Sequence, residues 1–317
     1  MNHTTIKVLC PIALMAASCA PSSATGKLPP LASEAEIDSA EKAPVIGIAH
    51  EAGWNAPSEP FTVAGNIHYV GTKAVSSWLI TTPKGHILIG GVIAQSAPQI
   101  IANIERLGFS IRDVRHLLNS HAHYDHAGGL AGLKQASGGT MIASAADKPY
   151  LEAGAIDHGP SAGMRFPPVR VDRVIGDGDR VSLGGTTMIA HLTPGHSPGC
   201  TSWSMEFKWK NSEHRKAFFH CSSTVAGQSL TPEAYPGMVA AFRSTFAKVR
   251  AIKVDLFLAN HDNFFDLDAK RLRQISGDPE AFFDPHELQR FNAELERAFE
   301  EDLARQQAKL KMNPATR

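Results

Sequence analysis

The sequence predicts an α/β protein made of two β-rich halves with helices on the outside. Short strand-like runs come first and a helical segment over 97–107 follows them, and the same order returns with a helical segment over 238–249. Strands followed by a helix, twice over, favour two sheets that are covered by helices. A hydrophobic content of 43% and 26 glycines fit a compact globular chain.

The elements of the first half are predicted from β-rich composition, turn residues and apolar spacing. Strand-like runs cover 61–70, 76–82 and 86–89. Pro83-Lys84-Gly85 is the expected turn between the last two of them. Over 97–107 the apolar residues recur at helical spacing. The apolar run Val114–Leu118 is interpreted as a strand, and a helix is expected to begin near Gly129.

The second half is predicted in the same way. Its strand-like runs cover 186–192, 201–207, 217–221 and 254–258. The helix over 238–249 precedes the last of these strands. Over 285–311 the chain has the pattern of a charged amphipathic helix, which we expect to form a solvated outer layer.

The N-terminal residues 1–24 are predicted to be an export signal and not part of the fold. The apolar run over 8–17 is too short to span a bilayer, and small residues follow it. Cys19 ends a sequence that resembles a lipoprotein cleavage box, so a lipid anchor there is an alternative to a free periplasmic protein. Residues 25–50 are expected to be a flexible linker to a domain over 51–317.

The charge balance argues against nucleic acid and membrane surfaces as partners. The chain carries 31 basic and 31 acidic residues, so it has no global electrostatic field to attract either. No membrane span and no protein partner are predicted. The unusual feature of the composition is its 15 histidines.

Four potential metal ligands lie within six residues, in a segment that directly follows the predicted strand Val114–Leu118. They are His121, His123, Asp125 and His126. Neutral imidazole and carboxylate groups suit Zn²⁺. His121 and His123 are two residues apart, so in an extended segment they face the same side. Asp125 and His126 follow where the chain must turn, so they can point at a second position nearby.

Two further histidines complete the set of ligands. His196 is enclosed by Pro and Gly in the turn over 193–199, and His261 follows the apolar run over 254–258. Six ligands divide into two groups of three, and three protein ligands with one open position are typical of a catalytic zinc. The spacing alone does not decide which metal each residue holds.

These motifs resemble the metallo-β-lactamase superfamily. The resemblance is carried by His-x-His-x-Asp-His-x-Gly-Gly over 121–129 and by Thr-Pro-Gly-His-Ser-Pro-Gly over 193–199. It runs from about Trp54 to Gln307. Three further segments, at 64–72, 96–100 and 235–250, resemble the third β-lactamase subclass, whose second metal is held by Asp-His-His. The resemblance implies an αββα sandwich with a dinuclear metal groove at the edge of the sheets.

The resemblance also assigns the ligands. It implies two Zn²⁺ per protomer, the first on His121, His123 and His196 and the second on Asp125, His126 and His261. Asp125 is in addition the candidate catalytic residue, because its carboxylate can orient the attacking hydroxide. A zinc-bound hydroxide is available at neutral pH because the metal lowers the pKa of water from 15.7 to about 7.

The function predicted from these observations is a zinc-dependent β-lactamase that opens the β-lactam amide and so gives antibiotic resistance. The alternative is an exported metallo-hydrolase of the same fold that acts on a lactone, a thioester or a phosphoester. Members of those branches carry an aspartate that bridges both metals, whereas this chain has no aspartate between Asp179 and Asp255. A non-catalytic zinc module is disfavoured, because the six ligands leave coordination positions open.

Three polar residues are candidates for binding the substrate. Ser222 and Thr224 can donate hydrogen bonds to the carboxylate beside a β-lactam nitrogen, and Gln228 is a further candidate for holding it. The alternative is that the two hydroxyls belong to an ordinary polar turn.

Cys200 and Cys221 are expected to form a disulfide in an oxidising compartment. The competing interpretation makes Cys221 a metal ligand.

One position departs from the family pattern. The superfamily usually has an aspartate at the end of the strand before the first helix, beneath the metal loop, and this chain has Gly90 there. Losing a group that supports metal ligands typically costs roughly 10–100-fold in metal affinity or activity. We expect either weakened activity or another residue that compensates.

Overall fold

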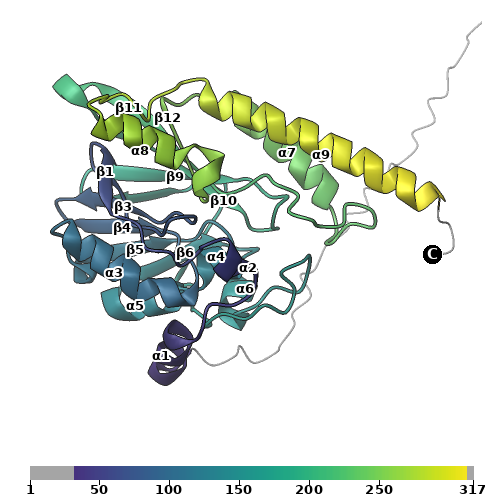
Figure 1. Ribbon diagram of the computed structural model, residues 1–317, viewed down its shortest axis with the longest axis horizontal. Helices are drawn as coiled ribbons and strands as arrows, with labels where there is room; N and C mark the ends of the chain where they lie inside the picture. The colour runs from purple at the N-terminus through teal and green to yellow at the C-terminus, as the bar shows by residue number, and fades with distance from the viewer. Residues whose placement is uncertain (1–31, 313–317) are drawn as a thin grey trace, which may run out of the picture.

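Two β-sheets pack face to face, with helices on both outer sides (Figure 1). The computed structural model describes residues 32–312. The arrangement is the αββα sandwich, so the predicted fold class is confirmed.

The first sheet has seven strands in chain order. They are β1 (Phe61–Ala64), β2 (Ile67–Tyr69), β3 (Trp78–Thr82), β4 (Gly85–Ile89), β5 (Val114–Leu118), β6 (Thr140–Ser144) and β7 (Arg173–Ile175). Pairing is antiparallel from β1 to β4 and parallel from β4 to β7. Parallel strands are covered on both faces, which is why β4 and β6 consist almost entirely of buried residues.

The second sheet has five strands in the order β12-β11-β10-β9-β8. Their bounds are β8 (Arg180–Leu183), β9 (Thr186–Leu192), β10 (Thr201–Lys208), β11 (His214–His220) and β12 (Leu256–Ala259). In β10 the side chains of Trp203, Met205 and Phe207 are buried, and Glu206 and Lys208 are exposed. This alternation turns one face of the strand toward the core between the sheets.

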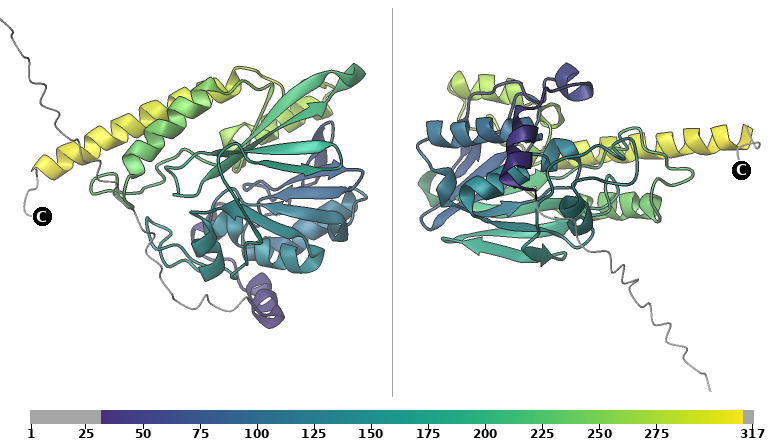
Figure 2. Two further views of the ribbon diagram at one scale, coloured as in Figure 1. Left: turned by 180° about the vertical axis from the view of Figure 1, so that it is seen from behind. Right: turned by 90° about the horizontal axis from the view of Figure 1, so that it is seen from below.

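Helices cover the outer faces of the sandwich. The first sheet carries α3 (Ala97–Arg106), α4 (Tyr124–Ala127), α5 (Leu130–Ser137) and α6 (Lys148–Ala153), and later in the chain come α7 (Met238–Ala251), α8 (Leu267–Ile275) and α9 (Glu287–Met312). Short 3-10 turns are η1 (Ala94–Ser96), η2 (Ile111–Asp113), η3 (Lys210–Ser212) and η4 (Asp262–Phe264). Figure 2 shows α9 lying alongside α7 and extending beyond the sheets.

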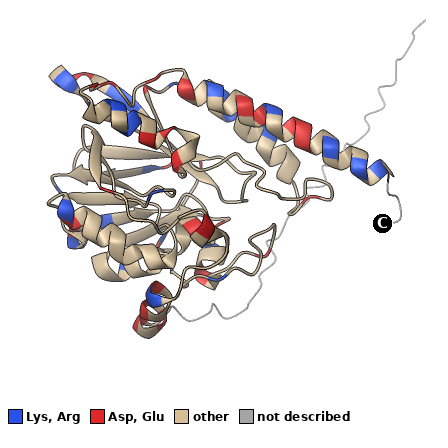
Figure 3. Ribbon diagram, viewed as in Figure 1, with Lys and Arg blue, Asp and Glu red and all other residues tan. Residues whose placement is uncertain are grey.

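The C-terminal helix α9 is amphipathic, as predicted, and it also has a packed face. Phe299 and Leu303 are buried against Phe242 and Phe246 of α7. Its other faces carry acidic and basic residues along its length (Figure 3). The prediction of a solvated layer therefore describes only the outer side of this helix.

Local differences from the predicted elements have physical reasons. The single strand predicted over 61–70 is a hairpin of β1 and β2, which turns at Gly65 with φ +53°. A Cβ at Gly65 would lie 2.8 Å from the Lys208 carbonyl oxygen, so the turn requires glycine. The strand predicted over 217–221 is observed from His214 to His220. The prediction missed its first residues because they are largely exposed and lack an apolar pattern.

The prediction of a flexible linker over 25–50 is wrong for residues 32–50. They form α1 (Glu34–Lys42) and α2 (Ile48–Glu51). Ser33 caps α1 through a capping box with Glu36, and Ile37 is buried against the helices of the first sheet. The prediction relied on a composition rich in Ser, Pro, Ala and Glu, so it missed both the capping box and the single buried apolar residue of α1.

The export signal predicted over 1–24, the lipid site at Cys19 and residues 25–31 lie outside the described residues. Between residues 32 and 312, no helix is long and apolar enough to cross a membrane.

Candidate metal centre

The six predicted ligands come together at one edge of the sandwich, each following the end of a strand or lying in a helix next to it. His121 and His123 lie in the loop after β5, and Asp125 and His126 lie in α4, which continues that loop. His196 follows β9 and His261 follows β12. The donor atoms form two groups of three, and these are the two groups implied by the family resemblance.

The first group has the geometry of a tetrahedral metal site. His123 Nδ1 lies 3.2 Å from His121 Nε2 and 3.1 Å from His196 Nε2. Two nitrogens bound to one tetrahedral zinc at 2.0–2.1 Å are about 3.3 Å apart. Three ring nitrogens that face each other at this spacing therefore fit a divalent cation between them.

The second group has one carboxylate and two imidazoles. Asp125 Oδ2 lies 3.0 Å from His126 Nε2 and 3.4 Å from His261 Nε2. Asp125 and His126 are buried, and His261 is partly exposed. This group can hold a second cation whose remaining positions face the groove.

Burial keeps the donors in the protonation state that a metal requires. It lowers the pKa of His121 and His123 well below the usual value and that of His196 to about 4, with neighbouring imidazoles adding to the effect for His121 and His123. Burial alone would raise the pKa of Asp125, but His126 and His261 hold it well below its usual range. At neutral pH His121, His123 and His196 are therefore neutral and Asp125 is charged, as metal ligands are.

Groups behind the ligands orient the rings. His196 Nδ1 lies 2.8 Å from the Thr224 carbonyl oxygen, so it carries the proton and donates, which leaves the Nε2 lone pair for a metal. Gln228 Nε2 donates to the His196 carbonyl oxygen at 2.7 Å. Asn260 Nδ2 lies 3.2 Å from His126 Nε2, so this amide contacts the donor nitrogen itself and not the far side of the ring.

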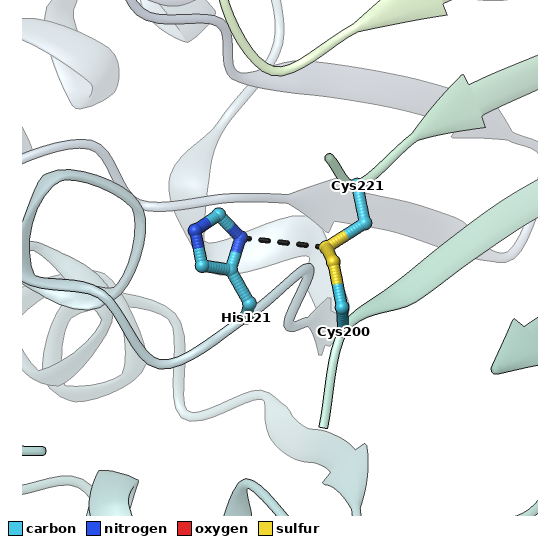
Figure 4. Close-up of side chains that lie close together, drawn as sticks. All are labelled: His121, Cys200 and Cys221. Carbon is cyan, nitrogen blue, oxygen red and sulfur yellow. Dashed lines mark hydrogen bonds between the residues drawn. A yellow bond between two sulfur atoms is a disulfide. The ribbon is translucent and has the colours of Figure 1, made fainter. Parts of the chain in front are cut away.

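The expected disulfide between Cys200 and Cys221 is present, and it lies next to His121 of the first group (Figure 4). Both cysteines are fully buried, and Cys221 Sγ lies 3.4 Å from His121 Nδ1. Because both sulfurs are bonded to each other, Cys221 offers no thiolate for a metal. The interpretation of Cys221 as a ligand is therefore excluded for this structure.

The predicted substrate-binding residues line a groove of about 700 Å³ above the ligands. Ser222 Oγ lies 3.1 Å from Thr224 Oγ1, and Thr224 Oγ1 lies 3.3 Å from His196 Nδ1. The amide nitrogen of Gln228 is already engaged by the His196 backbone. The structure thus places all three residues at the groove, with Gln228 supporting a ligand loop.

Sequence reasoning missed the apolar side of this groove. Trp54, Tyr124 and Met164 line it together with Ile48 of α2. The Trp54 ring lies 5.7 Å from that of Tyr124 and 5.9 Å from that of His261. Apolar residues that are scattered over short helices and loops carry no periodic signal, so only the fold shows that these four meet.

Comparisons with solved structures agree with this geometry. The chain is 42% identical to BJP-1, a subclass B3 metallo-β-lactamase of Bradyrhizobium japonicum, with a TM-score of 0.77, over 83% of this chain and 100% of that one. It is 34% identical to the FEZ-1 metallo-β-lactamase from Legionella gormanii, with a TM-score of 0.77, over 80% of this chain and 98% of that one.

Curated relatives match a shorter region. A hydroxyacylglutathione hydrolase of Rhodospirillum rubrum is 34% identical over 103 residues, which is 32% of each chain. A probable metallo-hydrolase of Burkholderia pseudomallei is 34% identical over 116 residues, which is 34% of this chain and 36% of the relative. The matched region thus spans about a third of the length of these relatives.

The family model of the metallo-β-lactamase superfamily matches residues 70–207, which include five of the six ligands. The motifs, the αββα fold, the paired donor groups and the similarity to BJP-1 over 83% of this chain all agree. The chain therefore belongs to the metallo-β-lactamase superfamily and is a metal-dependent hydrolase that resembles subclass B3.

Proposed function

We propose that the protein is a zinc-dependent β-lactamase that holds two Zn²⁺ per protomer and opens the amide of the β-lactam ring. The main support is the donor set. Among the described residues, Asp125 is the only carboxylate in the two groups and it belongs to the second, so the donor set contains no further carboxylate that would bridge two bound metals. The similarity to B3 β-lactamases over most of the chain points the same way.

Bound zinc polarises a carbonyl and supplies a nucleophile at neutral pH by lowering the pKa of water. The chain's own residues arrange that chemistry. Asp125 Oδ2 faces both His126 and His261, and the carboxylate stays charged, so Asp125 can orient an attacking water. The hydrogen bond from His196 to Thr224 keeps this ring in one tautomer.

The walls of the groove fit a substrate with an anionic and an apolar part. The hydroxyls of Ser222 and Thr224 lie on one wall, where they can donate to a carboxylate. Trp54 and Met164 line the same groove and can contact apolar substituents. Such a division suits a β-lactam, whose carboxylate lies beside the ring nitrogen.

Thioester hydrolysis is the second candidate. It is favoured by the match to a hydroxyacylglutathione hydrolase over 103 residues. That match covers about a third of the chain, whereas the β-lactamase similarity covers 83% of it. We therefore rank amide hydrolysis first.

The deciding experiment compares two substrates on the zinc-loaded protein. A chromogenic cephalosporin should be hydrolysed, an S-acyl glutathione thioester should react much more slowly, and a chelator should abolish turnover of both. Faster hydrolysis of the thioester would overturn the β-lactamase proposal and favour the second candidate.

The binding role of Ser222 and Thr224 is tested separately. Replacing both by Ala should raise KM for penicillins and cephalosporins roughly 10-fold, because a hydrogen bond to a charged group contributes about 1.5–3 kcal/mol. The zinc content should not change. Ser182 and Thr187 form a similar hydroxyl pair, with oxygens 2.8 Å apart, on the exposed hairpin of β8 and β9. The Ser182→Ala, Thr187→Ala variant is the control and should keep the normal KM.

A periplasmic location is part of the proposal. It is supported by the apolar run over 8–17 and by the disulfide, which is typical of exported proteins. Fractionation of cells that express the full chain should recover the protein with the periplasm or, if Cys19 is lipidated, with the membranes.

A further inference from the structure

Asp147 is a fully buried carboxylate that belongs to neither group of metal donors. It lies in the turn between β6 and α6 and is the N-terminal flanking residue of α6. Burial raises the pKa of Asp147 to about 7. Ionisable groups whose pKa is strongly shifted by burial cluster at functional sites, so Asp147 is a candidate for a functional role.

The carboxylate of Asp147 faces both loops that carry the first group of ligands. Asn119 Nδ2 donates to Asp147 Oδ2 at 2.8 Å, whereas Asp147 Oδ1 has no hydrogen-bond partner among the described residues. The Gly199 and Ala122 backbone amides are near enough to the carboxyl group to lower its pKa against the effect of burial. Ala122 lies between two ligands, His121 and His123. Gly199 belongs to the turn that carries His196. One side chain therefore lies beside both ligand-bearing segments.

The approach to Gly199 is close enough to require glycine there. A Cβ at this position would lie 2.1 Å from Asp147 Oδ1 and 2.3 Å from Cγ. The end of β6 holds the same residue from another direction, because Ser144 Oγ donates to the Gly199 carbonyl oxygen at 2.8 Å. The Asp147 amide in turn donates to Ser144 Oγ at 3.2 Å. These contacts fasten the His196 loop to the end of β6.

The position of Asp147 also bears on the missing aspartate at Gly90. In the first sheet β5, which leads into the metal loop, lies between β4 and β6. Gly90 follows β4 and contributes only a backbone contact, its N–H donating to the Leu118 carbonyl oxygen at 3.1 Å. Asp147 follows β6. A carboxylate thus flanks the same loop from the opposite neighbouring strand.

We propose that Asp147 is the positioning residue of the first metal site, taking the place of the carboxylate that Gly90 lacks. By facing the Ala122 and Gly199 amides, it sets the spacing between the His121–His123 pair and His196. The proposal rests on the metal site of the proposed function and does not depend on the substrate.

The test measures metal binding without substrate. In a His261→Ala background, where the second group is incomplete, zinc affinity is determined by competition with a chromophoric chelator. Asp147→Asn should weaken zinc binding roughly 10–100-fold. It should also change the ligand-field absorption of the Co²⁺-loaded protein, which reports the geometry of the ligands. Gly199→Ala leaves the carboxylate in the chain but displaces it, and should give the same two changes.

Glu152 provides the matched control. It is a buried carboxylate in α6 that hydrogen-bonds to Lys148 and to the Val171 amide, neither of which belongs to a ligand loop. Glu152→Gln should lower thermal stability without changing zinc affinity or the Co²⁺ spectrum. The proposal is overturned if Asp147→Asn and Gly199→Ala bind zinc as tightly as the His261→Ala parent with an unchanged spectrum. It is equally overturned if Glu152→Gln loses zinc to the same extent. Absence of β-lactam hydrolysis would refute the proposed function but would not affect the proposal for Asp147, which is tested by metal binding alone.

Discussion

Replacing His220 should remove part of the protein's sensitivity to acid. His220 is the last residue of β11, and its side chain is 3% exposed. Its ring lies against Phe291, with centroids 5.6 Å apart, and Nε2 lies 3.1 Å from Ser223 Oγ. Burial lowers the pKa of His220 to about 3, with a smaller contribution from the nearby His196.

The size of the effect follows from this pKa and from the value of about 6.5 for an exposed histidine. The unfolded chain binds a proton at His220 below pH 6.5, whereas the folded protein resists it down to about pH 3. The stabilisation is therefore fully present above pH 6.5 and is lost as the pH falls toward 3. Between pH 7 and pH 5 one such group costs about 2 kcal/mol of unfolding free energy.

The assay is urea unfolding of the metal-free protein at pH 7 and pH 5. The loss of unfolding free energy between these pH values should be about 2 kcal/mol smaller in His220→Gln than in the unsubstituted protein. Glutamine can keep a hydrogen bond to Ser223 but does not titrate. His214 is exposed at the other end of β11 and provides the control. His214→Gln should lose as much unfolding free energy between pH 7 and pH 5 as the unsubstituted protein. An equal loss in His220→Gln and the unsubstituted protein would refute the reasoning.

Two other changes test the centre and its support. Asp125→Asn should lower turnover by on the order of 100-fold while the first metal stays bound, because the amide keeps the shape of the carboxylate and loses its charge. Elemental analysis measures the bound metal and steady-state kinetics measures turnover. Near-normal turnover in this variant would contradict the prediction. Replacing Cys200 and Cys221 together by Ser should lower the unfolding free energy by about 3 kcal/mol, since the disulfide joins residues 21 apart. Urea midpoints with and without reductant measure it, and a stability unchanged by the substitutions would be inconsistent with this estimate.

Local pattern was enough to predict much of this protein. Val114–Leu118 is a strand as predicted, and the helices predicted over 97–107 and 238–249 end within two residues of the observed ones. Periodicity along one segment is a local property, so the sequence carries it directly. The four ligands within six residues could be identified for the same reason, since one loop brings them to one place.

Only the tertiary structure decided how distant segments combine. His196 lies 73 residues beyond His123, yet their ring nitrogens are 3.1 Å apart, because β5 and β9 end at the same edge of the two packed sheets. No local pattern reveals that Asp147 faces the Gly199 loop or that Ile37 packs on the helices of the first sheet. These contacts depend on which elements become neighbours when the sheets pack. The packing arrangement is determined by the burial of apolar surface from the whole chain, which no single segment encodes.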